Sequence, residues 1–189
     1  MSNLTAIQID EELNVLIESL DVGKRQIPPV SVLLKRSLAI PLLALMLSLV
    51  STVVFYLASY KDEATVTGFI EFFLSEGWYL IGITLVVGFL VFFMTYNNQL
   101  IYMTLPKEVR DNSLIFCHLS AVVRRILTIF ILLMSVSCAM SAFSAWFAIS
   151  IPVLLLVMFV VTGIVVSSEI NRLGAGVALE KVSALLKKI

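Results

Sequence analysis

Charged and amide side chains are missing from one long stretch of the chain, Ile126 to Ser168, which contains no Asp, Glu, Lys, Arg, His, Asn or Gln over 43 residues. As a single helix this stretch would measure about 65 Å, roughly twice the hydrocarbon thickness of a bilayer. It must therefore fold back on itself. We expect the turn at Ala148 to Pro152, because Ser150 can cap a new helix and proline is tolerated only in a helix's first turn. The pattern predicts a transmembrane hairpin.

Two further apolar stretches precede this hairpin. The first, Ser37 to Tyr60, contains 24 residues without a formal charge, and the second begins at the aromatic pair Trp78-Tyr79. Both are long enough to cross a membrane, and aromatic residues are common at membrane–water interfaces. Asn112-Ser113 is placed to cap a helix that runs directly into the third span. The predicted spans are residues 37–60, 78–98, 126–147 and 151–168.

Amphipathic segments flank the spans at both ends of the chain. Residues 1–36 and 169–189 carry apolar side chains at helical spacing, with charged residues mostly on the other faces. The composition is 60% hydrophobic with a mean hydropathy of +1.04, whereas soluble domains are about 45–50% apolar. We predict an all-α integral membrane protein, with four transmembrane helices in residues 37–168 and amphipathic cytoplasmic helices at the N- and C-termini.

The basic residues indicate the orientation in the membrane. Residues 1–36, 97–125 and 169–189 hold four Lys or Arg each, whereas the connection between the first two spans holds only Lys61 and the hairpin turn holds none. Cytoplasmic loops carry an excess of Lys and Arg. Because twelve of the thirteen basic residues fall on one side, we expect both termini to be cytoplasmic, with four spans rather than three or five.

The chemistry-bearing residues are few. The spans contain no ionisable group of the kind that ion-coupled transporters use, so a coupled transporter is disfavoured. Cys117-His118 would need further ligands or a base to form a metal or thiol site, and the chain has no second histidine. On one helix, Cys117 and Cys138 would lie about 31 Å apart, too far for a disulfide. We expect no catalytic site, metal or cofactor and, at zero net charge, no direct nucleic-acid binding.

Small residues recur along the spans at a spacing of about four. Such residues let helix backbones approach closely in lipid, where packing rather than hydrophobicity drives association. They predict either packing within one four-helix bundle or the seam of a homo-oligomer. The helix-packing candidates are Ser137, Ser141, Ala145 and Gly163.

The connection from Lys61 to Gly77 combines four carboxylates with apolar side chains. It is too apolar to float freely, so we expect it to rest on the outer membrane interface. It serves either as an interfacial linker or as a recognition surface, since aromatic anchors beside charges are common in protein interfaces. The candidate partner-recognition residues are Lys61, Asp62, Glu63, Phe69, Glu71, Phe72 and Glu76.

Four motifs stand near the borders of these segments: Glu12-Leu13-Asn14-Val15-Leu16, Gly23 to Pro28, Leu34-Lys35-Arg36 and Glu169-Ile170-Asn171-Arg172-Leu173. With its size and topology, they make the chain similar to the TraS entry-exclusion proteins of F-like conjugative plasmids, which are small inner-membrane proteins with several spans and no enzymatic motif. The resemblance implies a place in the bacterial inner membrane of a plasmid-bearing recipient. There the protein would block redundant DNA entry by recognising TraG, a component of the donor's mating machinery.

Two other functions fit a chain that has candidate binding surfaces but no recognisable catalytic or transport residues. One is an immunity protein against a pore-forming bacteriocin, which also protects by recognition in the membrane. The other is a small channel or transporter subunit, in which partner proteins supply the polar groups that transport requires. The expected partners are membrane lipid, a TraG-like protein if the resemblance holds, and a second copy of the chain.

Overall fold

The computed structural model describes residues 11, 28–60, 64–104 and 107–172 of the chain. Four long helical segments account for most of them, and each is long and apolar enough to cross a membrane. The prediction of four helices that could span a membrane is confirmed, and the described part of the chain is all-helical. The long helices are Val30–Ser59 (α2), Trp78–Thr104 (α4), Leu114–Met140 (α6) and Ala145–Arg172 (α7).

The predicted terminal amphipathic helices lie largely outside the described residues. Where the terminal segments are described, residues 30–36 form the first turns of α2, and residues 169–172 form the last turn of α7. The first and fourth spans are therefore longer than the sequence pattern suggested.

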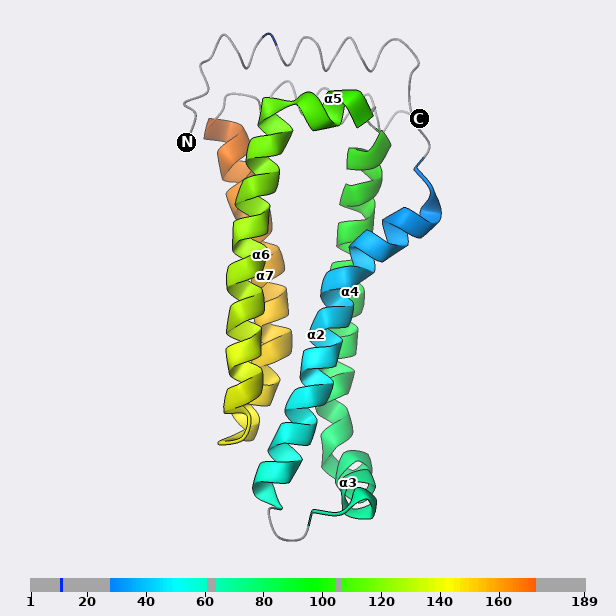
Figure 1. The fold of residues 1–189 in the computed structure, drawn as a ribbon, viewed down its shortest axis with the longest axis vertical. Coiled ribbons are helices and arrows are strands. Elements are labelled where there is room, and N and C mark those ends of the chain that lie inside the picture. The colour runs from blue at the N-terminus through cyan, green and yellow to red at the C-terminus, as the bar shows by residue number, and fades with distance from the viewer. Residues whose placement is uncertain (1–10, 12–27, 61–63, 105–106, 173–189) are drawn as a thin grey trace.

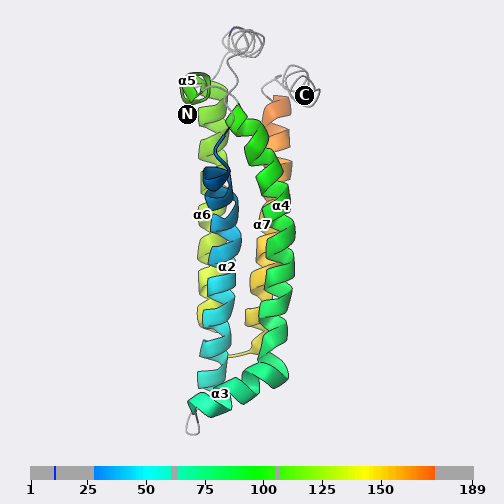
Figure 2. The same ribbon diagram turned by 90° about the vertical axis from the view of Figure 1, so that its right-hand side faces the viewer.

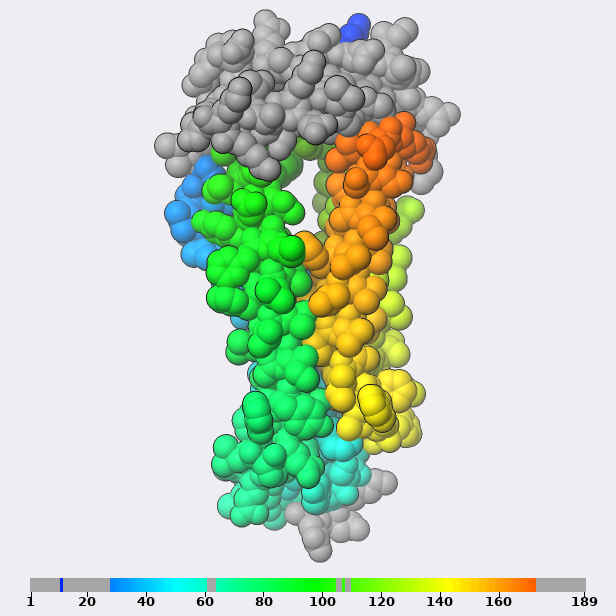
Figure 3. All heavy atoms as spheres, turned by 180° about the vertical axis from the view of Figure 1, so that it is seen from behind, coloured from blue at the N-terminus to red at the C-terminus, as the bar shows by residue number. Residues whose placement is uncertain are grey.

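The long helices form two antiparallel hairpins, α2 with α4 and α6 with α7, which pack against each other (Figure 1, Figure 2). The short helix α5 (Lys107–Asn112) crosses one end of the bundle between α4 and α6. Another short helix, α3 (Val66–Phe72), lies across the opposite end. From behind, α4 and α7 lie close together toward the α3 end, and a hollow separates them toward the α5 end (Figure 3).

The turn of the second hairpin lies at residues 141–144, so the predicted turn at Ala148 to Pro152 is wrong. A serine does stand at the start of the new helix, but it is Ser144. Its Oγ accepts a hydrogen bond from the backbone N–H of Trp146 at 3.4 Å, as a helix-capping serine does.

Pro152 lies inside α7, where its side chain is buried. Transmembrane helices tolerate proline in their interior because neighbouring helices and hydroxyl side chains compensate for the freed backbone groups. Ser150, the predicted cap, is also internal to α7, and its hydroxyl donates to the carbonyl oxygen of Phe147 at 2.7 Å. The prediction failed because it treated Pro152 as a mark of a helix start.

The connection between the first two spans is helical rather than a loop. The side-chain oxygen of Thr65 caps α3 by accepting a hydrogen bond from the backbone N–H of Gly68 at 3.1 Å. Helix α3 continues into a π-helical turn, η1 (Phe73–Gly77), which leads directly into α4. Such π-turns are rare and often occur at functional sites.

One predicted helix border, the start of α6, agrees with the structure. Ser113 caps α6 by accepting a hydrogen bond from the backbone N–H of Phe116 at 3.3 Å, and α6 then runs without interruption into the third span. Helix α4 continues beyond the second predicted span to Thr104. The start of α6 is therefore as the sequence indicated, whereas the short helix α5 was not predicted.

A row of small residues on α2 faces the interior of the bundle. Ser48 on this row meets Thr84 of α4, whose Oγ1 lies 3.0 Å from the Ser48 hydroxyl and 2.9 Å from the carbonyl oxygen of Leu80. These short side chains allow the close approach that helix association in lipid requires. The row consists of the buried residues Ser37, Pro41, Ala44, Ser48, Ser51 and Thr52.

Two hydrogen bonds set the register of α6 against α2. The thiol of Cys138 donates to the carbonyl oxygen of Leu47 at 3.5 Å, and the hydroxyl of Ser141 donates to the carbonyl oxygen of Ser51 at 3.1 Å. The end of α6 is therefore level with Ser51, whereas α2 continues to Ser59. At the rise of an α-helix, the α2–α3 end projects about 12 Å beyond the α6–α7 turn.

The cross-helix contact between Thr84 and Ser48 predicts a measurable contribution to stability. Thr84→Val keeps the shape of the side chain but removes the hydroxyl, and we expect unfolding in micelles to become easier by about 0.5–1.5 kcal/mol. Thr128→Val is the matched control, because the exposed Thr128 hydroxyl bonds only the carbonyl oxygen of Arg124 on its own helix. Equal losses in the two variants would show that the contact between helices adds nothing.

Candidate functional site at the α3 end of the bundle

Aromatic rings converge where α3 crosses the end of α2. Tyr56 is central, with ring centroids 4.9 Å from Tyr60, 5.3 Å from Phe69 and 5.5 Å from Phe72. Tyr56 is 3% exposed and Phe72 is 8% exposed, so both rings belong to the interior of this end. We call this end, made of residues 55–60 and 64–77, the α3 tip.

The hydroxyl of Tyr56 connects α2 to the start of α3. It donates to the carbonyl oxygen of Thr65 at 3.1 Å and accepts from the backbone N–H of the same residue at 3.3 Å. Thr65 in turn caps α3. One side chain thus satisfies two backbone groups and fixes where α3 begins.

Gly68 makes this close approach possible. A Cβ atom at this position would lie 2.6 Å from the Tyr56 hydroxyl and 3.0 Å from the side-chain oxygen of Thr65. Real Cβ atoms essentially never come so close to another heavy atom. The glycine is therefore needed for space rather than for an unusual backbone conformation.

The predicted recognition residues divide into three groups. Glu71 and Glu76 are exposed, as a surface role requires. Phe72 is buried and Phe69 is half-buried, so the expectation that they are exposed anchors is not met. The remaining candidates, Lys61, Asp62 and Glu63, lie outside the described residues.

Other apolar side chains take the exposed positions of the α3 tip. Val66 is 80% exposed and Leu74 is 70% exposed, and Ile70 and Trp78 are also exposed. These four residues follow one another at intervals of four along α3, η1 and the start of α4. The sequence shows this spacing, but it does not show which face of α3 is exposed, because that depends on how α3 packs against Tyr56.

The α3 tip also contains a pocket of about 330 Å³. Its walls come from three elements: the end of α2, α3 and η1. The exposed residue Glu71 is among those that line it. The lining residues are Tyr56, Tyr60, Gly68, Glu71, Phe72 and Ser75.

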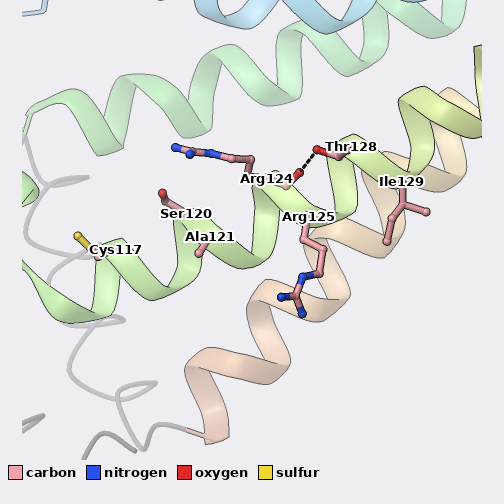
Figure 4. Close-up of a pocket in the computed structure, with 7 residues that line it drawn as sticks. All are labelled: Cys117, Ser120, Ala121, Arg124, Arg125, Thr128 and Ile129. Carbon is pink, nitrogen blue, oxygen red and sulfur yellow. Dashed lines mark hydrogen bonds between the residues drawn. The ribbon is translucent and has the colours of Figure 1, made fainter. Parts of the chain in front are cut away.

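A second hollow, of about 520 Å³, lies along α6 near the α5 end (Figure 4). Arg124 and Arg125 line it, but their side chains extend to opposite sides of the helix, Arg124 toward α4 and Arg125 toward α7 (Figure 4). Cys117 also lines this hollow. The diverging guanidinium groups do not converge on one ligand position, so this hollow is the weaker candidate for a site.

Polar contacts near this end connect α6 to α7. His118 Nε2 lies 3.4 Å from Glu169 Oε2, and the other carboxylate oxygen of Glu169 accepts from Arg172 at 3.3 Å. Both Cys117 and Cys138 are free thiols, as predicted. Within the described part of the chain, no group of three or more His, Cys, Asp or Glu residues is arranged to hold a metal ion.

The helix-packing candidates do not all occupy the same environment. Ser137 and Ser141 are buried, and the Ser137 hydroxyl bonds the carbonyl oxygen of Phe147 at 2.8 Å across the hairpin. Ala145 is half-buried at the start of α7. Gly163 is exposed, and a Cβ there would meet nothing within 4 Å, so it takes no part in packing within the described bundle.

The contacts of Gly68 predict that the α3 tip is sensitive to a single added methyl group. Gly68→Ala should force Tyr56 away from Thr65, and amide hydrogen exchange in α3 should become about tenfold faster, equivalent to a loss of about 1.4 kcal/mol in opening free energy. Gly82→Ala is the matched control, because its added Cβ would meet only the Trp78 ring, at an ordinary 3.8 Å. Unchanged exchange in Gly68→Ala would refute this account of the tip.

Comparisons of this chain with protein-family models, with curated proteins and with solved structures find no match. The function is therefore inferred from the residues and from their arrangement in the bundle.

Proposed function

We propose that this chain is an entry-exclusion protein of the bacterial inner membrane, which blocks redundant conjugative DNA transfer by recognising a TraG-like protein of the donor's mating machinery. The observation that carries the proposal is the α3 tip, a helical cap held in place by Tyr56 that presents carboxylates and apolar side chains at one end of the bundle. A preorganised surface of this kind suits binding, since little conformational freedom is lost on association. The similarity to TraS proteins supplies the biological setting.

The membrane core supports binding rather than transport. Residues 37–59, 78–96, 126–140 and 145–168, which form the apolar parts of the four long helices, contain no Asp, Glu, Lys, Arg or His. Their buried polar groups are mainly hydroxyls that bond to backbone carbonyls or to each other, as in the pair of Ser48 and Thr84. Pumps and coupled transporters use ionisable groups at this depth.

The distribution of basic residues supports an orientation with both termini in the cytoplasm. The hydrogen bonds between α2 and α6 join residues that are about 90 positions apart in the sequence. Lys35 and Arg36 on α2 therefore lie near the same end of the bundle as Arg124 and Arg125 on α6. The described residues 64–104, which include α3 and η1, contain no Lys or Arg. By the positive-inside rule the α3 tip then faces the periplasm, where a donor protein can reach it.

This orientation predicts opposite labelling of two cysteines in intact cells. A membrane-impermeant maleimide should label Ser75→Cys in a chain that also carries Cys117→Ser, because Ser75 is exposed at the α3 tip. The exposed natural Cys117 at the other end should react only after the cytoplasmic membrane is opened. The reverse pattern would place the tip in the cytoplasm and remove it from the reach of a donor cell.

The proposed function predicts selective protection of recipient cells. Recipients that express this chain alone should receive a matching plasmid at a frequency at least tenfold lower than cells with an empty vector, while transfer of a non-matching plasmid stays unchanged. Equal transfer of the two plasmids would end the proposal. Exchanging residues 61–77 for those of a related protein should move the preference, and an unmoved preference would assign recognition to residues 1–36 or 97–125.

Two alternatives have different readouts in the same cells. An immunity protein would protect against a pore-forming bacteriocin without changing plasmid transfer. A channel or transporter subunit would change ion or solute flux in vesicles that contain the purified chain. Neither effect is expected from an exclusion protein that acts only by binding.

A further inference from the structure

The pocket of the α3 tip combines aromatic faces with a negative charge. The rings of Tyr56, Tyr60 and Phe72 are mutual neighbours, with centroids between 4.9 and 6.2 Å apart. Glu71 also lines this pocket. Aromatic faces and a carboxylate are the two kinds of group that attract an organic cation, the rings through their negative faces and the carboxylate through charge-assisted hydrogen bonds.

The pocket is fixed before any ligand arrives. Two of its lining residues, Tyr56 and Phe72, are buried, and the Tyr56 hydroxyl is held by both backbone groups of Thr65. On the η1 side, the hydroxyl of Ser75 donates to the carbonyl oxygen of Phe72 at 3.2 Å. Tyr60, Glu71 and Ser75, which also line the pocket, are exposed, so it opens to the surface.

Charge complementarity favours a cation. Glu71 has no ion-pair partner among the described residues, and the nearest other charge on this stretch of α3 and η1 is a second carboxylate, Glu76. At about 330 Å³ the pocket is near the lower limit of small-molecule sites, so it has room for one side chain rather than for a folded segment.

The position of the pocket favours a protein over a lipid as the source of the cation. Tyr60 follows the last residue of α2, and this end projects about 12 Å beyond the α6–α7 turn. Beside this turn, at the start of α7, Trp146 is 78% exposed, and exposed tryptophans are typical of the membrane–water interface. The pocket therefore lies on the part of the bundle that reaches farthest past this aromatic level.

We infer that the pocket of the α3 tip binds a Lys or Arg side chain presented by the partner protein, with its cationic group over the rings of Tyr60 and Phe72 and against the carboxylate of Glu71. The inference rests on the proposed function, because it names the chemistry by which the tip recognises its partner. Exposed apolar residues around the pocket, such as Ile70 and Leu74, would supply the surrounding contact.

A binding experiment on the full chain tests this inference without a donor protein. The chain, with Cys117→Ser, Cys138→Ser and a trifluoroethyl label on Thr67→Cys, is placed in phosphatidylglycerol nanodiscs and followed by fluorine NMR; Thr67 is exposed on α3 and does not line the pocket. Capped pentapeptides with a central Lys, Arg or norleucine are then added. We expect saturable shifts with Lys and Arg but not with norleucine, and an affinity five- to tenfold weaker in Glu71→Gln. Glu76→Gln removes the same charge outside the pocket lining and should change the affinity by less than twofold.

Four outcomes would overturn the inference. Equal binding of the norleucine peptide would show that the site is apolar. Equal effects of Glu71→Gln and Glu76→Gln would show that the peptides respond to the general negative charge of the tip rather than to the pocket. A shift that appears in phosphatidylethanolamine nanodiscs before any peptide is added would identify a lipid amine as the occupant. Binding that requires Lys61→Ala would identify the chain's own lysine as the occupant.

The plasmid-transfer assay separates this inference from the proposed function. If wild-type chain excludes matching plasmids but the peptides do not bind, the cation pocket is wrong and exclusion stands. If the Lys and Arg peptides bind through Glu71 but no exclusion occurs, the pocket stands and the proposed function fails. If both hold, Glu71→Gln should weaken exclusion at least fivefold while Glu76→Gln leaves it within twofold of wild type.

Discussion

Close contact between helix backbones is the constraint on which the rest of this bundle depends. In lipid, apolar side chains gain little by meeting one another, so helices associate through tight packing and a few hydrogen bonds. The row of small residues on α2 supplies both, because Ala44 lets neighbouring side chains reach the helix and Ser48 bonds to α4. Contacts from Cys138 and Ser141 extend the same arrangement to α6. We call these contacts of α2 with α4 and α6 the central seam, and they set the positions of the helix ends.

The seam explains how the α3 tip comes to stand at one end of the molecule. Hydrogen bonds to Leu47 and Ser51 hold the end of α6 level with Ser51, so the second hairpin ends before the first. The last turns of α2 therefore have no neighbour from α6 or α7 at their level. Helix α3 and η1 cover them instead, and the rings around Tyr56 form a small core of their own.

Much of the fold could be predicted because it depends on length and local signals. Uninterrupted apolar stretches indicated four long helices, and the start of α6 followed from the capping residue Ser113. The hairpin turn was misplaced because Pro152 disrupts a helix in water but is tolerated between packed helices in lipid. The role of Tyr56 was hidden, since a tyrosine at the end of a span resembles any interfacial tyrosine until α3 brings Thr65 against it. Which phenylalanine faces inward depends on this same contact and on the π-turn.

The hydrogen bonds of Tyr56 to Thr65 have a consequence for how such a protein can diversify. The residues that hold α3 in place, Tyr56, Thr65 and Gly68, are separate from those that meet the surroundings, such as Ile70 and Leu74. Exposed positions can change in size and charge while the framework beneath them keeps its shape, because surface substitutions usually alter stability by less than about 0.5 kcal/mol. Related chains could thus acquire different partners through a handful of substitutions on one short helix, without any change in the membrane-embedded bundle.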